Sequence, residues 1–426
     1  MKDATAAPHA TVNVGSGRLF YYSLTAALAG FLFGFDTVVI SGAEQTIQRL
    51  WSLSAAVHGI AMGAALYGTV LGSLIGAWPA DRFGRRPTLL AVGVLFLVSA
   101  IASALAPTAG FFIVARFVGG LGIGISTVAA PMYISEIAPP EKRGRLAAMF
   151  QFNIVLGIVL AFASNAVLAR IVSGADAWRW MLGVAAVPSL IYSVMCLGLP
   201  ESPRWLAMRA EGVIGDRPAT GFWTWRMRVP IALAFLVAFF NQLSGINAIL
   251  YFAPRIFALS GLGEQAALLQ SVGIGVTNLV FTFVGLGLID RLGRRTLLLI
   301  GSIGYILSLG ACAWAFYTHH ETIVPICIFA FIAAHAIGQG TVIWVLISEI
   351  FPNRYRAAGQ SLGSATHWVF AALLTTVFPL MVAAFHPGAI FLFFTVMMAL
   401  QLVWVLTTVP ETKGVPLEEI QRRLGL

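Results

Sequence analysis

The chain has 426 residues, 59% of them hydrophobic and 10% charged, with a formal net charge of +9. Soluble domains carry about 25% charged residues, so the composition excludes a soluble multidomain protein and indicates an integral membrane protein. The net charge does not indicate a nucleic-acid partner, because Lys and Arg concentrate in the two termini and in alternate loops between apolar stretches. This asymmetry follows the positive-inside rule and predicts that both termini lie in the cytoplasm. The basic residues outside this pattern are Arg49, Arg170, Arg179 and Arg255 in the opposite loops and Arg116 inside an apolar stretch.

Twelve stretches of the chain are long enough to cross a membrane, since a spanning helix needs about 20 apolar residues. They cover residues 19–42, 56–80, 87–107, 109–135, 144–172, 178–199, 229–257, 265–289, 296–317, 323–348, 357–384 and 388–409. The predicted fold is all-α, with twelve transmembrane helices in two pseudo-symmetric six-helix bundles. The predicted domains are an N-terminal bundle at residues 1–199, a short cytoplasmic linker at 200–228, a C-terminal bundle at 229–411 and a cytoplasmic tail at 412–426.

The first span contains Asp36 and the fourth contains Arg116. Asp36 is about 16 residues into its helix and Arg116 is about 20 residues, or roughly 30 Å, before Glu136, so both fall near the same outer depth. They are predicted to be the only clearly buried ionisable residues of the first half and to pair, because an unpaired charge in lipid is costly. Arg116 would hold Asp36 charged, and a conformational change that separates them would favour uptake of a proton. The alternative is a static structural ion pair.

Charged signatures in the connecting loops occur twice, at intervals of about 210 residues. The repeated strings are DRFGRRP at 81–87 and DRLGRRT at 290–296, SEI at 135–137 and 348–350, and PES at 200–202 and PET at 410–412. The repetition predicts two halves with the same structure. Transporters built from such repeats bind a small solute at the interface between the halves.

Several amides lie at mid-membrane depth. Gln151 is about two turns into the fifth span and Gln242 is about 13 residues, or roughly 20 Å, into the seventh. Asn247 lies one to two turns further along, and Asn278 lies midway through the eighth span. An amide both donates and accepts hydrogen bonds, as a sugar hydroxyl does, and it is costly in a spanning helix unless it faces an interior. Each could instead form an interhelical hydrogen bond.

Taken together, these strings resemble the sugar porter family of the major facilitator superfamily, and in particular its bacterial proton-coupled sugar symporters. The resemblance covers essentially the whole chain and rests on GFDT at 34–37, PMYISE at 131–136, PESPRWL at 200–206, NQLSGIN at 241–247 and PETKG at 410–414, together with the loop signatures. It implies the major facilitator fold. The chain departs from the family in its short linker and in Asn241, which replaces the first Gln of a Gln-Gln pair.

The resemblance implies a set of sugar-binding residues. These are Gln151, Asn241, Gln242, Asn247 and Asn278, with Trp344 of the tenth span as the aromatic residue near the sugar. His367 of the eleventh span stands where the family usually has Asn or Gln. It either tunes sugar preference or is a satisfied core histidine. His335 is expected to be a packing residue.

The resemblance also implies roles for charged residues. An aspartate at the position of Asp36 is typical of the proton-coupled members, with Arg116 as its partner. A second set is expected to latch the two bundles together on the inner side when the site faces outward, and the alternative is that these charges only determine topology. This set comprises Asp81, Arg85, Glu136, Arg143 and Glu201 in the first half and Asp290, Arg294, Glu349, Arg356 and Glu411 in the second.

The sequence therefore predicts a secondary active transporter that moves a monosaccharide with a proton by alternating access in a bacterial inner membrane, as a monomer. The alternatives are a sugar uniporter with a structural Asp36–Arg116 pair and a transporter-like sugar sensor. An enzyme is not expected, because the chain shows no nucleotide loop, nucleophile triad or metal cluster. No cofactor, metal or nucleic acid is expected, and Cys196, Cys312 and Cys327 are interpreted as packing residues.

Overall fold

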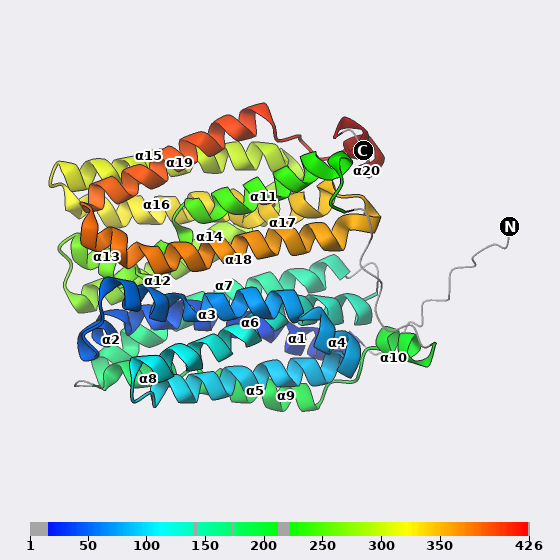
Figure 1. The fold of residues 1–426 in the computed structure, drawn as a ribbon, viewed down its shortest axis with the longest axis horizontal. Coiled ribbons are helices and arrows are strands. Elements are labelled where there is room, and N and C mark those ends of the chain that lie inside the picture. Colours follow the sequence, from blue (N-terminus) through cyan, green and yellow to red (C-terminus); the bar gives the residue numbers. More distant parts are fainter. Residues whose placement is uncertain (1–15, 140–142, 173, 175, 212–221, 425–426) are drawn as a thin grey trace.

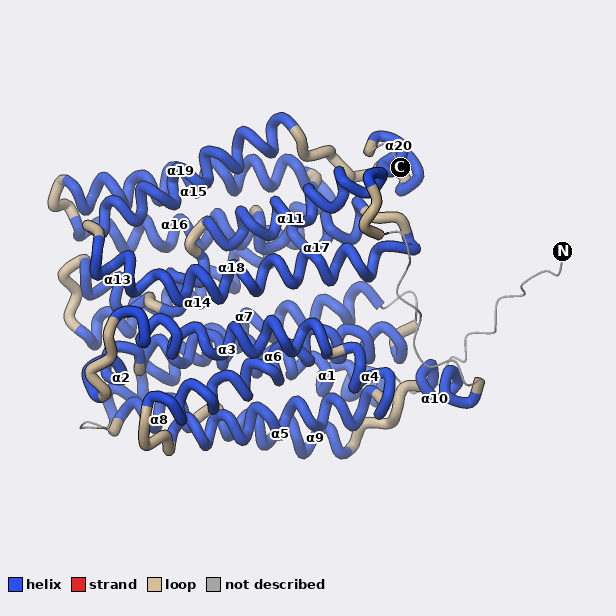
Figure 2. The backbone as a smooth tube through the Cα atoms, viewed as in Figure 1, coloured by secondary structure: helices blue, strands red, loops and turns tan. Residues whose placement is uncertain are grey.

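The computed structural model describes residues 16–139, 143–172, 174, 176–211 and 222–424. Residues 212–221 of the expected linker, and residues 1–15 and 425–426 of the expected tails, lie outside the described part. The described residues form helices and turns without any strand (Figure 2). Twelve helical segments are long and apolar enough to cross a membrane, which confirms the predicted number of spans.

The helices form two bundles that lie side by side along their length (Figure 1). The first bundle contains α1 (Ser16–Val39), α2 (Glu44–Leu50), α3 (Ala55–Ile75), α4 (Ala77–Phe83), α5 (Arg85–Ala104), α6 (Ala109–Ile137), α7 (Arg143–Ile171), α8 (Ala177–Gly183) and α9 (Ala186–Leu197). The second bundle contains α11 (Arg228–Leu243), α12 (Ile246–Tyr251), α13 (Ala253–Leu259), α14 (Glu264–Leu292), α15 (Arg294–Tyr317), α16 (Val324–Ile337), α17 (Gln339–Ile350), α18 (Arg356–Ala384) and α19 (Pro387–Thr407). Short helices α10 (Pro203–Ala210) and α20 (Leu417–Arg423) lie at one end of the molecule, here called the linker side.

Several of the predicted spans contain a break, and the breaks in the seventh and the tenth bear on the site. The seventh consists of α11, α12 and α13, and Gly245 at the first break has a φ of 89°, a conformation that glycine adopts without steric penalty. The tenth consists of α16 and α17, which are separated at Gly338. Backbone freed from a helix inside a membrane is tolerated where it lines a cavity or is buried in protein. Both breaks therefore point to the interior of the molecule.

The two bundles are in close contact through α3 with α18 and through α7 with α14. Glycines make the approach possible, because a Cβ at Gly59 would collide with the backbone oxygen of Thr376 and one at Gly275 would meet the backbone of Val159. The hydroxyls of Tyr67 and Thr376 are 2.9 Å apart across the same interface. Small residues at such positions are a common device of helix packing in membranes.

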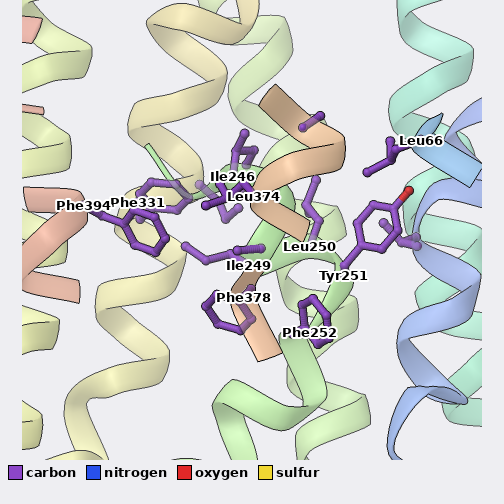
Figure 3. Close-up of a cluster of buried hydrophobic side chains, with 14 of the residues drawn as sticks. Leu66, Ile246, Ile249, Leu250, Tyr251, Phe252, Phe331, Leu374, Phe378 and Phe394 are labelled. Atoms are coloured by element: carbon purple, nitrogen blue, oxygen red, sulfur yellow. The ribbon is translucent and has the colours of Figure 1, made fainter. Parts of the chain in front are cut away.

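The hydrophobic core also crosses between the bundles. Ile249, Leu250 and Phe252 of the broken seventh span are buried within it, and Tyr251 is directed toward Leu66 of the first bundle (Figure 3).

Candidate substrate site

A cavity of about 150 Å³ lies between the bundles, where the broken helices meet. Cavities of about this volume hold a six-membered ring. The first bundle contributes residues of α1 and α7 to its wall, and the second bundle contributes residues of α11, α12, α14, α16, α17 and α18. All seven predicted sugar-binding residues line it: Gln151, Asn241, Gln242, Asn247, Asn278, Trp344 and His367. The structure thus brings them together, and their role toward a sugar remains a prediction.

Gln242 is the centre of a hydrogen-bonded amide network. Its side chain is fully buried, and its Nε2 donates to Oδ1 of Asn241 at 2.9 Å. Its Oε1 accepts from Nδ2 of Asn247 at 2.6 Å. Nε2 also lies 3.2 Å from each ring nitrogen of His367. The side chain of Gln242 therefore links polar groups of α11, α12 and α18. A polyhydroxyl ligand could replace these hydrogen bonds with its own, since a hydroxyl both donates and accepts.

An aromatic wall borders this network. The ring of His367 is close to two indole rings: its centre is 5.3 Å from that of Trp344 and 4.6 Å from that of Trp368, its neighbour on α18. Phe33 of the first bundle packs edge-on against Trp368 with a ring separation of 5.4 Å. Amides and aromatic rings in one cavity wall suit a ligand that has both hydroxyl groups and an apolar face.

Other lining residues were missed from the sequence. Thr37 and Thr282 add hydroxyls to the wall, and Thr282 donates to Oδ1 of Asn278 at 3.5 Å. Thr282 follows Asn278 by four residues and so shares its helix face, a spacing that could have revealed it. The interpretation of His335 as a packing residue was wrong in part. His335 lines the cavity, although its Nδ1 is held by the Tyr305 hydroxyl at 2.7 Å.

Asp36 and Arg116 form an ion pair in the first bundle. Nη1 of Arg116 donates to Oδ1 of Asp36 at 2.6 Å, and Nη2 donates to the backbone oxygen of Asp36 at 3.0 Å. Both side chains are buried, and Oδ2 of Asp36 and Nε of Arg116 have no hydrogen-bond partner among the described residues. The carboxylate thus keeps one oxygen without a hydrogen bond from these residues. Asp36 directly precedes Thr37, which lines the cavity.

The expectation that Asp36 and Arg116 are the only buried ionisable residues of the first half was wrong. Glu44 and His58 are both fully buried at the end of the molecule opposite the linker side, and Arg85 is nearly so on the linker side. The sequence does not reveal the burial of Glu44 and His58, because it depends on contacts with Arg255 and Phe252 of the second bundle.

The predicted latch residues of the first half pair within the first bundle. Arg85 donates to Glu136 through Nε at 3.0 Å and Nη2 at 2.8 Å, and to Asp81 at 3.0 Å. Glu201 accepts from the backbone nitrogen of Arg85 at 2.9 Å. Ser202 donates to Glu136 at 2.5 Å. These contacts fix the ends of α5 and α6 to the start of the linker.

The second half repeats this arrangement. Arg294 donates to Glu349 at 3.1 and 2.8 Å and to Asp290 at 3.1 Å. Glu411 accepts from the backbone nitrogen of Arg294 at 2.9 Å, and Thr412 donates to Glu349 at 2.6 Å. The two clusters are equivalent partner by partner, so the sequence repeat is a structural repeat.

The remaining two latch residues add no contact between the bundles. Arg356 donates to the backbone oxygen of Ser348 at 2.9 Å within the second bundle. The side chain of Arg143 lies outside the described part. A latch that joins the bundles thus stays a prediction for a conformation other than this one.

Two repeated helical bundles with a polar cavity between them define the class of protein: a secondary transporter of the major facilitator fold. The family model described as "Sugar (and other) transporter" matches residues 22–219 and 217–424. The chain therefore belongs to the sugar porter family, and it is a sugar transporter rather than an enzyme.

Individual relatives agree with this assignment. The D-xylose-proton symporter of Escherichia coli (strain K12) is 33% identical over 473 residues, which cover 95% of this chain and 96% of that protein. The arabinose-proton symporter of Bacillus subtilis (strain 168) is 34% identical, with 95% of each chain covered. Among solved structures, the inward-open conformation of the xylose transporter XylE from E. coli has a TM-score of 0.84 at 31% identity and covers 95% of this chain and 99% of its own.

Proposed function

We propose that the protein cotransports a monosaccharide and a proton across a bacterial plasma membrane by alternating access, as a monomer with both termini in the cytoplasm. One observation carries the proposal: a cavity lined by amides and aromatic rings from both bundles adjoins, along α1, a buried carboxylate–guanidinium pair. Relatives described as proton symporters of D-xylose and arabinose support it.

The experiment is uptake of labelled pentoses, hexoses and polyols into proteoliposomes, with and without an imposed pH gradient. The proposal expects at least one sugar to accumulate above its external concentration only when the gradient is present. Uptake of no sugar would overturn the sugar assignment.

A uniporter is the second candidate, because the two hydrogen bonds between Asp36 and Arg116 suit a structural pair. It expects uptake that stops at equal concentrations on both sides whatever the pH gradient.

The proposed orientation makes this structure an inward-facing form. The linker side is assigned to the cytoplasm by the positive-inside rule. The bundles are joined at the opposite, outer side, where α3 and α18 approach through Gly59. The similarity to the inward-open form of XylE supports this assignment.

Glu136→Gln and Glu349→Gln are each expected to shift the resting population toward the inward-facing form. Each variant weakens the ion pair between the glutamate and the arginine of its own cluster. We propose that the charged groups of the two clusters attract each other in the outward-facing form and so hold its inner side closed. Labelling of single cysteines from each side, in a background without the three native cysteines, measures the shift. The control is Glu419→Gln, whose carboxylate pairs with Arg422 and Arg423 of the same short helix, α20. An unchanged labelling pattern in both variants would leave topology as the role of these charges.

His367→Asn is expected to change the ranking of transported sugars more than the amount of folded protein. The substitution restores an amide where the imidazole now contacts Gln242, with a different reach and donor pattern. The uptake panel measures the ranking. His319→Asn, a change in an exposed loop, is the matched control. An identical ranking would assign His367 to packing.

A further inference from the structure

A cluster of charged and polar side chains joins the bundles at the outer side. Arg255 of α13 donates to Glu44 of α2 through Nε at 2.9 Å and through Nη2 at 2.8 Å. Arg255 also donates to Oε1 of Gln48. His58 of α3 places Nε2 at 2.9 Å from the same carboxylate. These four residues are called the outer cluster below.

The outer cluster differs from the other charged groups of the chain in what it joins. Of the ion pairs whose partners are both described, the pair of Glu44 and Arg255 connects the first bundle to the second. The others lie within one bundle or within α20. Glu44 is fully buried, while the side chain of Arg255 is 18% exposed. Opening of the outer side must separate these two groups, because they belong to bundles that move apart.

We propose that the outer cluster is the latch of the outer gate. The inference rests on the proposed alternating access, and it assigns to these residues a role in gating rather than in sugar binding or in the Asp36 pair. Glu44 and Arg255 are the two halves of the latch. His58 is a positioning residue that holds the carboxylate toward Arg255.

The hydrogen bond of His58 shows how it positions the carboxylate. Nε2 lies 2.9 Å from Oε2 of Glu44 and donates to it, because a carboxylate oxygen accepts. Nδ1 is buried and has no hydrogen-bond partner among the described residues. The contact with Glu44 therefore orients the imidazole and the carboxylate toward each other, with Arg255 on the same carboxylate.

The surroundings of His58 contain few other charges. On α2, Arg49 is exposed and bonds Thr46 at 3.5 Å. The outer half of α18, residues 372–384, has no ionisable residue. On α6, Arg116 is engaged with Asp36 of α1. Phe252 packs edge-on against the imidazole with a ring separation of 6.2 Å. The outer cluster therefore stands apart from the other charged groups named here.

The test is a distance measurement between spin labels at the outer ends of the two bundles. Labels at Leu50→Cys on α2 and Leu259→Cys on α13 suit it, because both side chains are exposed and lie on opposite partners of the gate. The three native cysteines are replaced by serine, and the protein is measured in nanodiscs without sugar. This readout does not depend on uptake, so a failed transport assay and a failed gate assay are distinguishable.

Glu44→Gln and Arg255→Gln are each expected to raise the ratio of open to closed outer gate by about tenfold or more, because removal of one partner leaves the other charge buried and unpaired. The double variant should open no further than either single variant, since each alone breaks the latch. Arg49→Gln removes an arginine of the same helix from outside the outer cluster and should leave the ratio unchanged. Equal ratios in wild type and both single variants would overturn the proposal.

His58→Ala and His58→Gln test the positioning role without removing either charge of the latch, so they remain informative where the charge variants fold poorly. His58→Ala removes the donor that Nε2 supplies to Glu44 and is expected to raise the open fraction. His58→Gln keeps a donor for Glu44 and is expected to hold the ratio near that of wild type. Equal ratios in wild type and His58→Ala would overturn the assignment of His58 as a positioning residue.

Discussion

Asp36→Asn is expected to abolish sugar accumulation driven by a pH gradient while sugar binding is retained. The proposed cycle needs Asp36 to alternate between a charged form paired with Arg116 and a neutral form that permits reorientation, and asparagine fixes the neutral form. One pH unit corresponds to about 1.4 kcal/mol, which supports about tenfold accumulation at one proton per sugar. The accumulation ratio of the variant should fall to one.

Proteoliposome uptake gives this ratio, and counterflow, in which sugar exchanges for sugar without net proton movement, shows that the variant still binds and translocates. Arg116→Ala should be defective as well, because it removes the partner with which the charged form of Asp36 pairs. Asp176→Asn is the matched control, since its carboxylate is exposed and pairs with a near neighbour in sequence. If Asp36→Asn still concentrates sugar, symport through Asp36 is ruled out.

Gln242→Ala is expected to weaken sugar binding by about tenfold or more in a protein that remains folded. A neutral hydrogen bond contributes about 0.5–1.5 kcal/mol, and a buried group left without its partner costs about 1–3 kcal/mol. Here one truncation releases Asn241, Asn247 and His367 together. Every 1.4 kcal/mol corresponds to about tenfold in affinity.

A binding titration with the best sugar of the uptake panel measures the effect. Gln401→Ala is the control, because Gln401 is also a fully buried amide, with partners Gln339 and Ser302, yet it does not line the cavity. Equal affinity in wild type and Gln242→Ala would remove Gln242 from the site.

The fold could be predicted because the signals for it are local. The length of an apolar run determines whether it can span a bilayer. The repeated strings around Arg85 and Arg294 show which helices of the two halves correspond to each other. The breaks at Gly245 and Gly338 escaped prediction, because both lie inside apolar runs that are long enough for one continuous helix.

The site could be predicted only in part. Amides such as Gln242 stand out against an apolar span, and the family resemblance selected among them. Thr37 and His335 have other common roles in helices, so only the packing of the bundles reveals that they face the cavity. Glu44 and Arg255 are 211 residues apart, and no local pattern relates them.

The short helix α12 has a thermodynamic consequence. Asn247 reaches the cavity from α12, and Tyr251, one turn later on the same face, is directed toward Leu66 of the first bundle (Figure 3). If α12, a helix of six residues and about 9 Å long, moves as one body, a ligand that displaces Asn247 also displaces Tyr251. Coupling between two sites is reciprocal. If bound sugar strengthens or weakens the contact between the bundles at Tyr251 by some factor, formation of that contact changes the affinity for sugar by the same factor. A substitution at Tyr251, which is not among the residues that line the cavity, is therefore expected to change the sugar dissociation constant.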